Sequence, residues 1–302
     1  VAGETGMVGR AILRHLAQED RTILSAPHHD LNLTNQAQTH DFLQTHKPDI
    51  IIMAAAKVGG IGANKNAPAD FLYQNNAMTQ NIIHGAYQAG VEKLLYLGSS
   101  CIYPKMAAQP IAEDALLSGA LEPTNEGYAL AKILGVKLCE FYRMQYGCDF
   151  VSVMPTNLYG AYDHFDAEKS HVIPALILKI YAAKIADEDE VILWGTGKPL
   201  REFLYVDDLA EGLIHILKNY SDALPINIGS GTEISIKDLA QLIAKIIGYQ
   251  GQIIFDAKMP DGTPRKFLDS SKINALGWKA ETSLEQGLQK AYQYYLSILP
   301  HG

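Results

Sequence analysis

Short and almost entirely apolar runs alternate with longer helical stretches along this chain, and this alternation constrains its fold most strongly. The apolar runs lie at residues 22–24, 49–56, 93–98 and 150–154. Strands that are apolar along their whole length are buried on both faces, as in a parallel sheet covered by helices on each side. The pattern therefore predicts an α/β protein built on a doubly wound parallel sheet.

The chain opens with glycines at every third position from Gly3, ahead of a stretch with helical apolar spacing. This pattern predicts a strand end, a tight turn, and a helix whose first N–H groups can hold a pyrophosphate. The spacing departs from G-x-G-x-x-G, so it is also compatible with an ordinary strand–helix turn. Ligands of such sheets bind beyond the carboxyl ends of the strands, so we expect Gly3, Ala54, Ser99 and Pro155 to share one rim.

Later patterns fill in the remaining elements. They predict long helices at 65–90 and 124–146, a helix at 174–184, and strands at 191–194 and 225–229. They also predict a strand at 201–206 that leads into a helix from about 208 to 218, with an aspartate as its N-terminal cap.

Composition and charge exclude several functions. The formal net charge of −8 over 302 residues argues against nucleic acid as the main partner. No apolar run is long enough to cross a membrane, and the ten histidines show no metal-ligand spacing, so no membrane or metal site is predicted. Three cysteines without a C-x-x-C pair indicate a reduced, cytoplasmic protein. The abrupt start leads us to expect further residues before Val1 in the native chain.

Tyr128 and Lys132 stand four residues apart in the second long helix, so they are expected on one face. A cation beside a phenol favours the phenolate, so we predict that Lys132 lowers the pKa of Tyr128 from about 10. A tyrosine of this kind can exchange a proton with a carbonyl or alcohol oxygen. Alone, the pair is more typical of a helix surface. Together with the glycine turn and Ser99 at a strand end, it indicates an active site.

These motifs resemble the extended short-chain dehydrogenase/reductase superfamily, and within it the GDP-L-fucose synthase family, nearly end to end. The most specific segments are 54–61, 97–105, 121–126, 152–160, 170–175 and 261–266. The resemblance implies an NADPH-dependent enzyme that converts GDP-4-keto-6-deoxy-D-mannose to GDP-L-fucose. The reaction would epimerise C3 and C5 through an enolate and then transfer a hydride to C4.

The length also predicts two domains, because 302 residues exceed what one core usually supports. We assign residues 1–160 to an NADP-binding Rossmann domain, to which 203–229 return. Residues 161–202 and 230–302 are assigned to a smaller α/β substrate-binding domain.

The resemblance also assigns catalytic roles. Epimerisation needs a base and an acid on opposite sides of the sugar ring, and these would be Cys101 and His171. Ser99 would donate a hydrogen bond to the C4 oxygen, Tyr128 would protonate the new alkoxide, and Lys132 would bind the nicotinamide ribose. Taken alone, Cys101 is more typical of a buried small apolar side chain, and His171 of a surface histidine. The place of Cys101 two residues after Ser99, and the family match around His171, favour the catalytic roles instead.

The remaining ligand contacts come from the same resemblance. The cofactor-binding residues would be Gly3, Thr5, Gly6, Met7, Val8, His28, Ala54, Ala55, Ala56, Tyr128, Lys132, Pro155, Asn157, Leu158 and His171. The substrate-binding residues would be Asn157, Lys179, Trp194, Arg201 and Lys266. The cations suit a diphosphate, whereas Trp194 is equally compatible with a core position. No acid follows the second strand to claim a 2′-hydroxyl, so NADPH is expected over NADH, with weaker discrimination than in arginine-bearing relatives.

Two alternatives remain open. One is a related 4-keto nucleotide-sugar reductase or epimerase that acts on another GDP-sugar. The other is a non-catalytic NADP-sensing regulator, against which the pair of Tyr128 and Lys132 argues. By analogy, we expect a homodimer formed through the two long helices, where Met78, Ile82 and Tyr87 are buried either within one subunit or at the interface.

Overall fold

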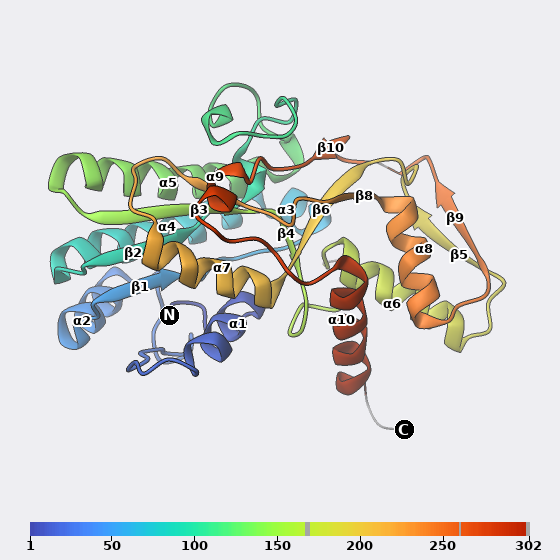
Figure 1. Ribbon diagram of the computed structural model, residues 1–302, viewed down its shortest axis with the longest axis horizontal. Coiled ribbons are helices and arrows are strands. Elements are labelled where there is room, and N and C mark those ends of the chain that lie inside the picture. The colour runs from blue at the N-terminus through green and yellow to red at the C-terminus, as the bar shows by residue number, and fades with distance from the viewer. Residues whose placement is uncertain (167–169, 260, 300–302) are drawn as a thin grey trace.

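A computed structural model describes residues 1–166, 170–259 and 261–299, which form two lobes side by side (Figure 1). The larger lobe contains a four-stranded parallel sheet. Its strands lie in the order β1 (Ile50–Met53), β2 (Lys93–Leu97), β3 (Asp149–Pro155) and β7 (Ile226–Ile228). The predicted α/β fold with a parallel sheet is confirmed.

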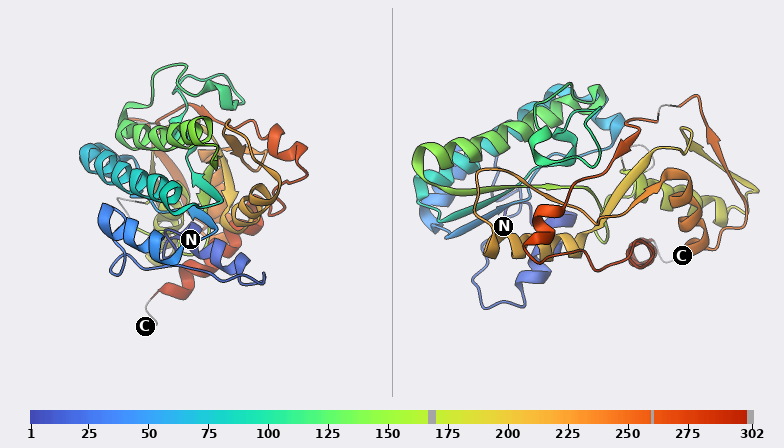
Figure 2. Two further views of the ribbon diagram at one scale, coloured as in Figure 1. Left: turned by 90° about the vertical axis from the view of Figure 1, so that its left-hand side faces the viewer. Right: turned by 45° about the horizontal axis from the view of Figure 1, so that its top comes forward.

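Helices cover both faces of this sheet (Figure 2). One face carries α2 (Gln36–His46), α4 (Pro68–Ala89) and α5 (Glu126–Tyr146), and the other carries α1 (Met7–Leu16) and α7 (Val206–Asn219). Successive strand residues alternate between the two cores. Tyr96 of β2 packs under α4 and α5, whereas Leu95 and Leu97 pack under α1 and α7. This two-sided burial explains why the strands are apolar throughout.

The predicted helix at 65–90 is divided in two. A short helix α3 (Ile61–Asn66) is followed by Ala67, and α4 begins at Pro68. A proline disfavours helical backbone in the residue before it and fits the first turn of a new helix, so Ala67 adopts φ −138° and ψ 47°. The second long helix agrees with the prediction, since α5 ends at Gly147 with φ +71°.

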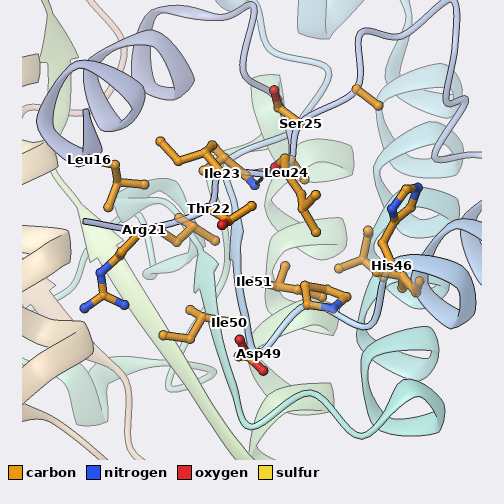
Figure 3. A pocket seen from close by; sticks show the side chains of 18 of the residues that line it. Leu16, Arg21, Thr22, Ile23, Leu24, Ser25, His46, Asp49, Ile50 and Ile51 are labelled. Atoms are coloured by element: carbon orange, nitrogen blue, oxygen red, sulfur yellow. Dashed lines mark hydrogen bonds between the residues drawn. The ribbon is translucent and has the colours of Figure 1, made fainter. Parts of the chain in front are cut away.

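Residues 22–24 do not form the predicted strand. A cavity of about 630 Å³ separates this segment from β1, and Figure 3 shows Thr22, Ile23 and Leu24 on one side of it with Ile50 and Ile51 on the other. The segment contacts the chain start instead, where the Val1 amino group donates to the Leu24 carbonyl oxygen at 2.7 Å and Ala2 forms a parallel bridge with Met53 of β1. None of the five predicted catalytic residues lines this cavity.

In the described part of the chain, the smaller lobe has two sheets and three packed helices. One sheet contains β4 (Asn157–Tyr159), β6 (Leu200–Tyr205), β8 (Glu233–Ser235) and β10 (Arg265–Lys266), and the other pairs β5 (Glu190–Trp194) with β9 (Gln252–Asp256). The helices are α6 (Val172–Ile185), α8 (Ile236–Ile247) and α10 (Leu284–Ile298). Their apolar faces share one core with Leu193 and Phe203 of the strands.

Two segments cross between the lobes. After β6, α7 packs on α1, and β7 joins β3 at the edge of the larger sheet. The chain then returns a second time at α9 (Ser271–Ala275), where Ile273 and Trp278 enter the larger lobe's core. This differs from the assignment of all of 230–302 to the smaller domain. The Trp278 ring lies against Gly212 of α7, a tertiary contact that no local pattern signals.

The aspartate cap predicted for α7 is wrong. Tyr205 occupies the N-cap position, and Asp207 and Asp208 lie in the first turn. The buried Asp208 carboxylate instead accepts hydrogen bonds from the backbone N–H groups of Glu281 (3.1 Å) and Thr282 (2.8 Å). It therefore ties α7 to the segment that precedes α10. Among the described residues, no helix combines the length and apolarity needed to cross a membrane.

Candidate active site

The glycine turn packs directly against the residues that follow β1. Gly3 has φ +89°, and a Cβ atom there would lie 2.6 Å from the backbone nitrogen of Ala55. A Cβ on Gly9 would lie 2.0 Å from the Gly3 carbonyl oxygen, whereas one on Gly6 would be 3.6 Å from its nearest neighbour. Close approach thus requires glycine at two of the three positions. This close packing places the N-terminal turn of α1 beside the end of β1. The N–H groups of that turn can bind the pyrophosphate of a dinucleotide.

The other predicted contacts of the glycine turn differ in burial. Met7 and Val8 begin α1 and pack against the core, whereas Thr5 is exposed. The Thr5 carbonyl accepts a hydrogen bond from Arg10 Nε at 2.9 Å. His28 lies in an exposed turn after the 22–24 segment.

The chain after β1 is held by a residue that sequence reasoning missed. Asn75 of α4 is 2% exposed, and its Oδ1 accepts from the Lys57 backbone nitrogen at 2.8 Å. Its Nδ2 donates to the carbonyl oxygens of Lys57 (3.0 Å) and Phe71 (2.8 Å). This clamp fixes the loop that contains Ala54, Ala55 and Ala56. A signal was present, because Asn75 lies four residues from both Phe71 and Thr79 on the inward face of α4.

Ser99 and Cys101 lie in a single 3₁₀ turn that follows β2, η1 (Ser100–Ile102). Ser99 is the N-cap, and its Oγ accepts a hydrogen bond from the Cys101 backbone nitrogen at 3.3 Å. Cys101 is buried, and burial raises the pKa of its thiol. The Lys266 ammonium, the Ser99 hydroxyl and the Lys132 ammonium each act in the opposite direction.

Tyr128 and Lys132 share one face of α5 as predicted, with Lys132 Nζ 5.8 Å from the centre of the Tyr128 ring. The predicted lowering of the Tyr128 pKa is contradicted, because burial raises the pKa of this phenol well above its ordinary value. The Lys132 ammonium is directed to the Leu97 carbonyl, to which it donates at 2.6 Å. Burial also lowers the pKa of Lys132 to about 8. Exclusion of water thus outweighs the attraction expected from spacing alone.

His171 approaches from the smaller lobe, where it is the N-cap residue of α6. His171 is exposed to solvent, as the surface alternative expected. Partial desolvation by the surrounding protein lowers the pKa of its imidazole, and the nearby cation of Lys266 acts in the same direction. Lys266 also interacts electrostatically with Cys101, and Cys101 in turn with Tyr128 and Lys132. The fold therefore gathers side chains from both lobes that are far apart in the sequence.

The predicted substrate residues occupy two places on the smaller lobe. Lys266 pairs with Arg201 in the parallel register of β10 and β6, so two cations are neighbours. Lys179 of α6 lies over the Trp194 ring, with Nζ 5.0 Å from its centre. Trp194 is 60% exposed, so the core alternative is wrong for this residue, and Trp278 is the buried tryptophan.

A second residue that sequence reasoning missed lies between these cations and the larger lobe. Glu202 is fully buried, and its carboxylate accepts from the backbone nitrogens of Gly231 (2.8 Å) and Leu268 (3.2 Å). Its carbonyl oxygen accepts from Asn157 Nδ2 at 2.7 Å. Burial raises the pKa of Glu202, while these N–H groups oppose that rise. A carboxylate directly before the apolar run 203–206 was the available signal.

The remaining predicted contacts lie near Asn157. Pro155 ends β3, and Leu158 follows Asn157 in β4. Within the described ranges, no cluster of three or more histidine, cysteine, aspartate or glutamate side chains is arranged to hold a metal ion.

Comparison with known proteins identifies the family. The sequence pattern of the NAD dependent epimerase/dehydratase family matches residues 1–229. The chain belongs to this family. It is 56% identical to the GDP-L-fucose synthase of Sinorhizobium fredii (strain NBRC 101917 / NGR234), across 98% of this chain and 95% of that protein. The GDP-L-fucose synthase of Escherichia coli (strain K12) is 52% identical over the same shares of the two chains.

A solved structure agrees with these relatives. The GDP-L-fucose synthetase of Naegleria fowleri bound to NADP superposes with a TM-score of 0.89 at 30% identity, covering 98% of this chain and 92% of that one. The resemblance predicted from the sequence is confirmed.

Proposed function

We propose that this protein is an NADPH-dependent epimerase and reductase that converts GDP-4-keto-6-deoxy-D-mannose to GDP-L-fucose. One observation carries the proposal, namely that a thiol and an imidazole from different lobes join the tyrosine–lysine pair. A simple ketone reductase needs a proton donor to one oxygen, as Tyr128 provides. Cys101 and His171 add the base and acid on separate elements that inversion at carbon requires. Full-length likeness to GDP-L-fucose synthases supports this assignment.

Epimerisation uses the acidity of the protons next to the C4 carbonyl. The Cys101 thiolate removes the proton from C3 or C5, the C–H bonding pair forms the enolate, and His171 returns a proton to the opposite face. The hydroxyl groups of Ser99 and Tyr128 donate hydrogen bonds to the enolate oxygen. The lowered pKa of His171 makes its protonated form a readier donor.

When bound, NADPH would supply the hydride for the reduction at C4. The glycine turn and the first turn of α1 hold its pyrophosphate, and Lys132 holds the ribose next to the nicotinamide. Because burial raises the pKa of Tyr128, the phenol stays protonated at neutral pH. Tyr128 therefore has a proton to give to the C4 oxygen as that oxygen gains negative charge.

The GDP moiety binds to the smaller lobe. Arg201 and Lys266 are adjacent cations on β6 and β10, and they neutralise the diphosphate. Trp194 offers an exposed aromatic surface with the Lys179 ammonium above one face. That surface suits stacking with a flat base or packing against a sugar ring.

We further propose a cytoplasmic homodimer. An exposed apolar stripe runs along α4 and α5, where Tyr73 is 73% and Met144 is 71% exposed, and it also contains Tyr87, Leu130 and Phe141. These five positions on α4 and α5 recur at helical spacing, as in a face that packs on another helix pair.

The residues named for this interface from sequence have different environments. Ile82 is buried and Met78 partly buried in the core of one subunit, so only Tyr87 belongs to the exposed stripe. The three free thiols support a reducing compartment.

The activity is tested by incubating the protein with NADPH and GDP-4-keto-6-deoxy-D-mannose in deuterated water. The expected product is GDP-L-fucose with deuterium at C3 and C5, identified by NMR. Cys101→Ser should lose most of the deuterium incorporation while still binding NADPH, and the matched Cys148→Ser variant should retain it. Tyr128→Phe should slow NADPH oxidation by about 100-fold or more while deuterium exchange continues.

Two results would contradict the proposal. NADPH oxidation without deuterium at C3 and C5 would identify a simple 4-reductase. Unchanged exchange in Cys101→Ser would remove this residue from the role of base.

A further inference from the structure

The ammonium group of Lys266 lies near the thiol of Cys101 and, among the described residues, has no hydrogen-bond or ion-pair partner. Its side chain and Cys101 line the same small cavity, of about 30 Å³, between η1 and β10. The adjacent Arg265 lines the same cavity, but its guanidinium is bound to both carboxylate oxygens of Glu233 at 2.7 and 2.8 Å. Of these two neighbouring cations, only Lys266 is left unneutralised.

The other cations near the thiol are engaged elsewhere. Lys132 of α5 donates its ammonium to the Leu97 carbonyl at 2.6 Å. Lys105, which also lines the cavity, forms an ion pair with Glu122 at 2.8 Å. Titratable and charged groups surround Cys101 on several elements. Those nearest within the larger lobe are Tyr96 of β2 and Tyr128 and Lys132 of α5. Those that line the cavity are Lys266 and Arg265 of β10 and the ion pair of Lys105 with Glu122.

We propose that Lys266 stabilises the Cys101 thiolate and so prepares the base for epimerisation, in addition to any contact with the substrate diphosphate. The inference rests on the proposed function of Cys101. Lys266 acts through that thiol, so it is a positioning residue and not itself the base. When the thiolate removes the C3 or C5 proton, an S–H bond forms and the C–H electron pair moves into the enolate.

The need for such a cation follows from the burial of the thiol. Removing water from Cys101 raises its pKa, which disfavours the thiolate that proton abstraction requires. Lys266 is the largest of the influences that act in the opposite direction. Burial lowers the pKa of Lys266, and the neighbouring cation of Arg201 acts in the same direction, whereas the Cys101 thiolate favours the ammonium. Losing the cation should therefore raise the pKa of the thiol without changing the shape of the turn that holds it.

The test measures the reactivity of Cys101 in the free protein, where no substrate is bound. Wild type, Lys266→Met, Lys266→Arg and Arg265→Met are alkylated with iodoacetamide between pH 6.5 and 9.5. The three cysteines lie on different tryptic peptides, so mass spectrometry follows Cys101 separately, with Cys148 as the internal reference. Lys266→Gln replaces the methionine variant if circular dichroism shows that the latter is unfolded.

The expected result is a titration of Cys101 reactivity that moves to higher pH when the charge is removed. At pH 8 the alkylation rate should fall by about tenfold, the effect of one pKa unit on the thiolate fraction. Lys266→Arg should restore most of the rate, and Arg265→Met should match wild type.

Equal profiles for wild type and Lys266→Met overturn the proposal. So does an equal loss in Lys266→Arg, because shape and not charge would then be responsible. Since no sugar is present, the result stands apart from the substrate test. A shift in reactivity without GDP-L-fucose formation refutes the proposed function alone.

Discussion

Lys132 should make the protein less stable at neutral pH, and replacing it should show this. The side chain is 4% exposed, and its Nζ lies 5.0 Å from the centre of the Tyr96 ring. Burial lowers the pKa of Lys132 from 10.5 to about 8. Between these values the unfolded chain binds more protons than the folded one, so stability increases as pH rises through this window. Below pH 8, the folded state carries the whole cost of a buried charge.

The size of this effect on the free energy of unfolding follows from the shift in the pKa of Lys132. A change in pKa from 10.5 to about 8 corresponds to about 3 kcal/mol of lost stability below pH 8. Lys132→Met removes the charge and keeps much of the side-chain volume, but it leaves the Leu97 carbonyl without its donor, which costs about 1–2 kcal/mol. We therefore expect the variant to be more stable than wild type by about 1–2 kcal/mol at pH 7. This advantage should shrink by about 1.4 kcal/mol per pH unit between pH 8 and 10.5.

The assay is urea unfolding of both proteins followed by circular dichroism at pH 6.5, 7.5, 8.5 and 9.5. Lys137→Met is the matched control, because Lys137 lies on the same helix in a half-buried ion pair with Glu140 at 2.7 Å. Its difference from wild type should stay within about 0.5 kcal/mol at every pH. A Lys132→Met variant whose stability relative to wild type does not change with pH would refute the reasoning. A loss of activity in Lys132→Met would not refute the reasoning, because Lys132 is also proposed to hold the cofactor.

Two further predictions concern the glycine turn and the exposed stripe. Gly9→Ala should destabilise the fold by about 1–3 kcal/mol in the same urea assay, because its Cβ would lie 2.0 Å from the Gly3 carbonyl oxygen. Gly6→Ala has space for its Cβ and should stay within about 0.5 kcal/mol of wild type, so equal losses would reject the packing argument. Phe141→Glu should convert a dimer to a monomer in sedimentation-velocity runs, whereas Ile185→Glu on the smaller lobe should not. A wild-type protein that sediments as a monomer, or a dimer that survives Phe141→Glu, would reject the proposed interface.

Local sequence patterns predicted much of the fold because their physical basis is local. Whole-strand apolarity predicted a sheet buried on both faces, and the separate cores around Tyr96 and Leu95 confirm it. The i, i+4 spacing was enough to place Tyr128 and Lys132 on one face of α5. The glycine positions likewise predicted the turn before α1, because only glycine accepts its backbone angles and close contacts.

Only the tertiary structure decided the electrostatics of the site, the place of each tryptophan and the pairing of each strand. Spacing predicted a lowered pKa for Tyr128, but burial by the whole fold raised it. The sequence left Trp194 open between a ligand contact and the core, and the structure exposes this tryptophan while burying Trp278. Lys266 reaches Cys101 only because β10 of the smaller lobe folds back beside η1. Such effects depend on water exclusion and on contacts between distant segments, which no local spacing encodes.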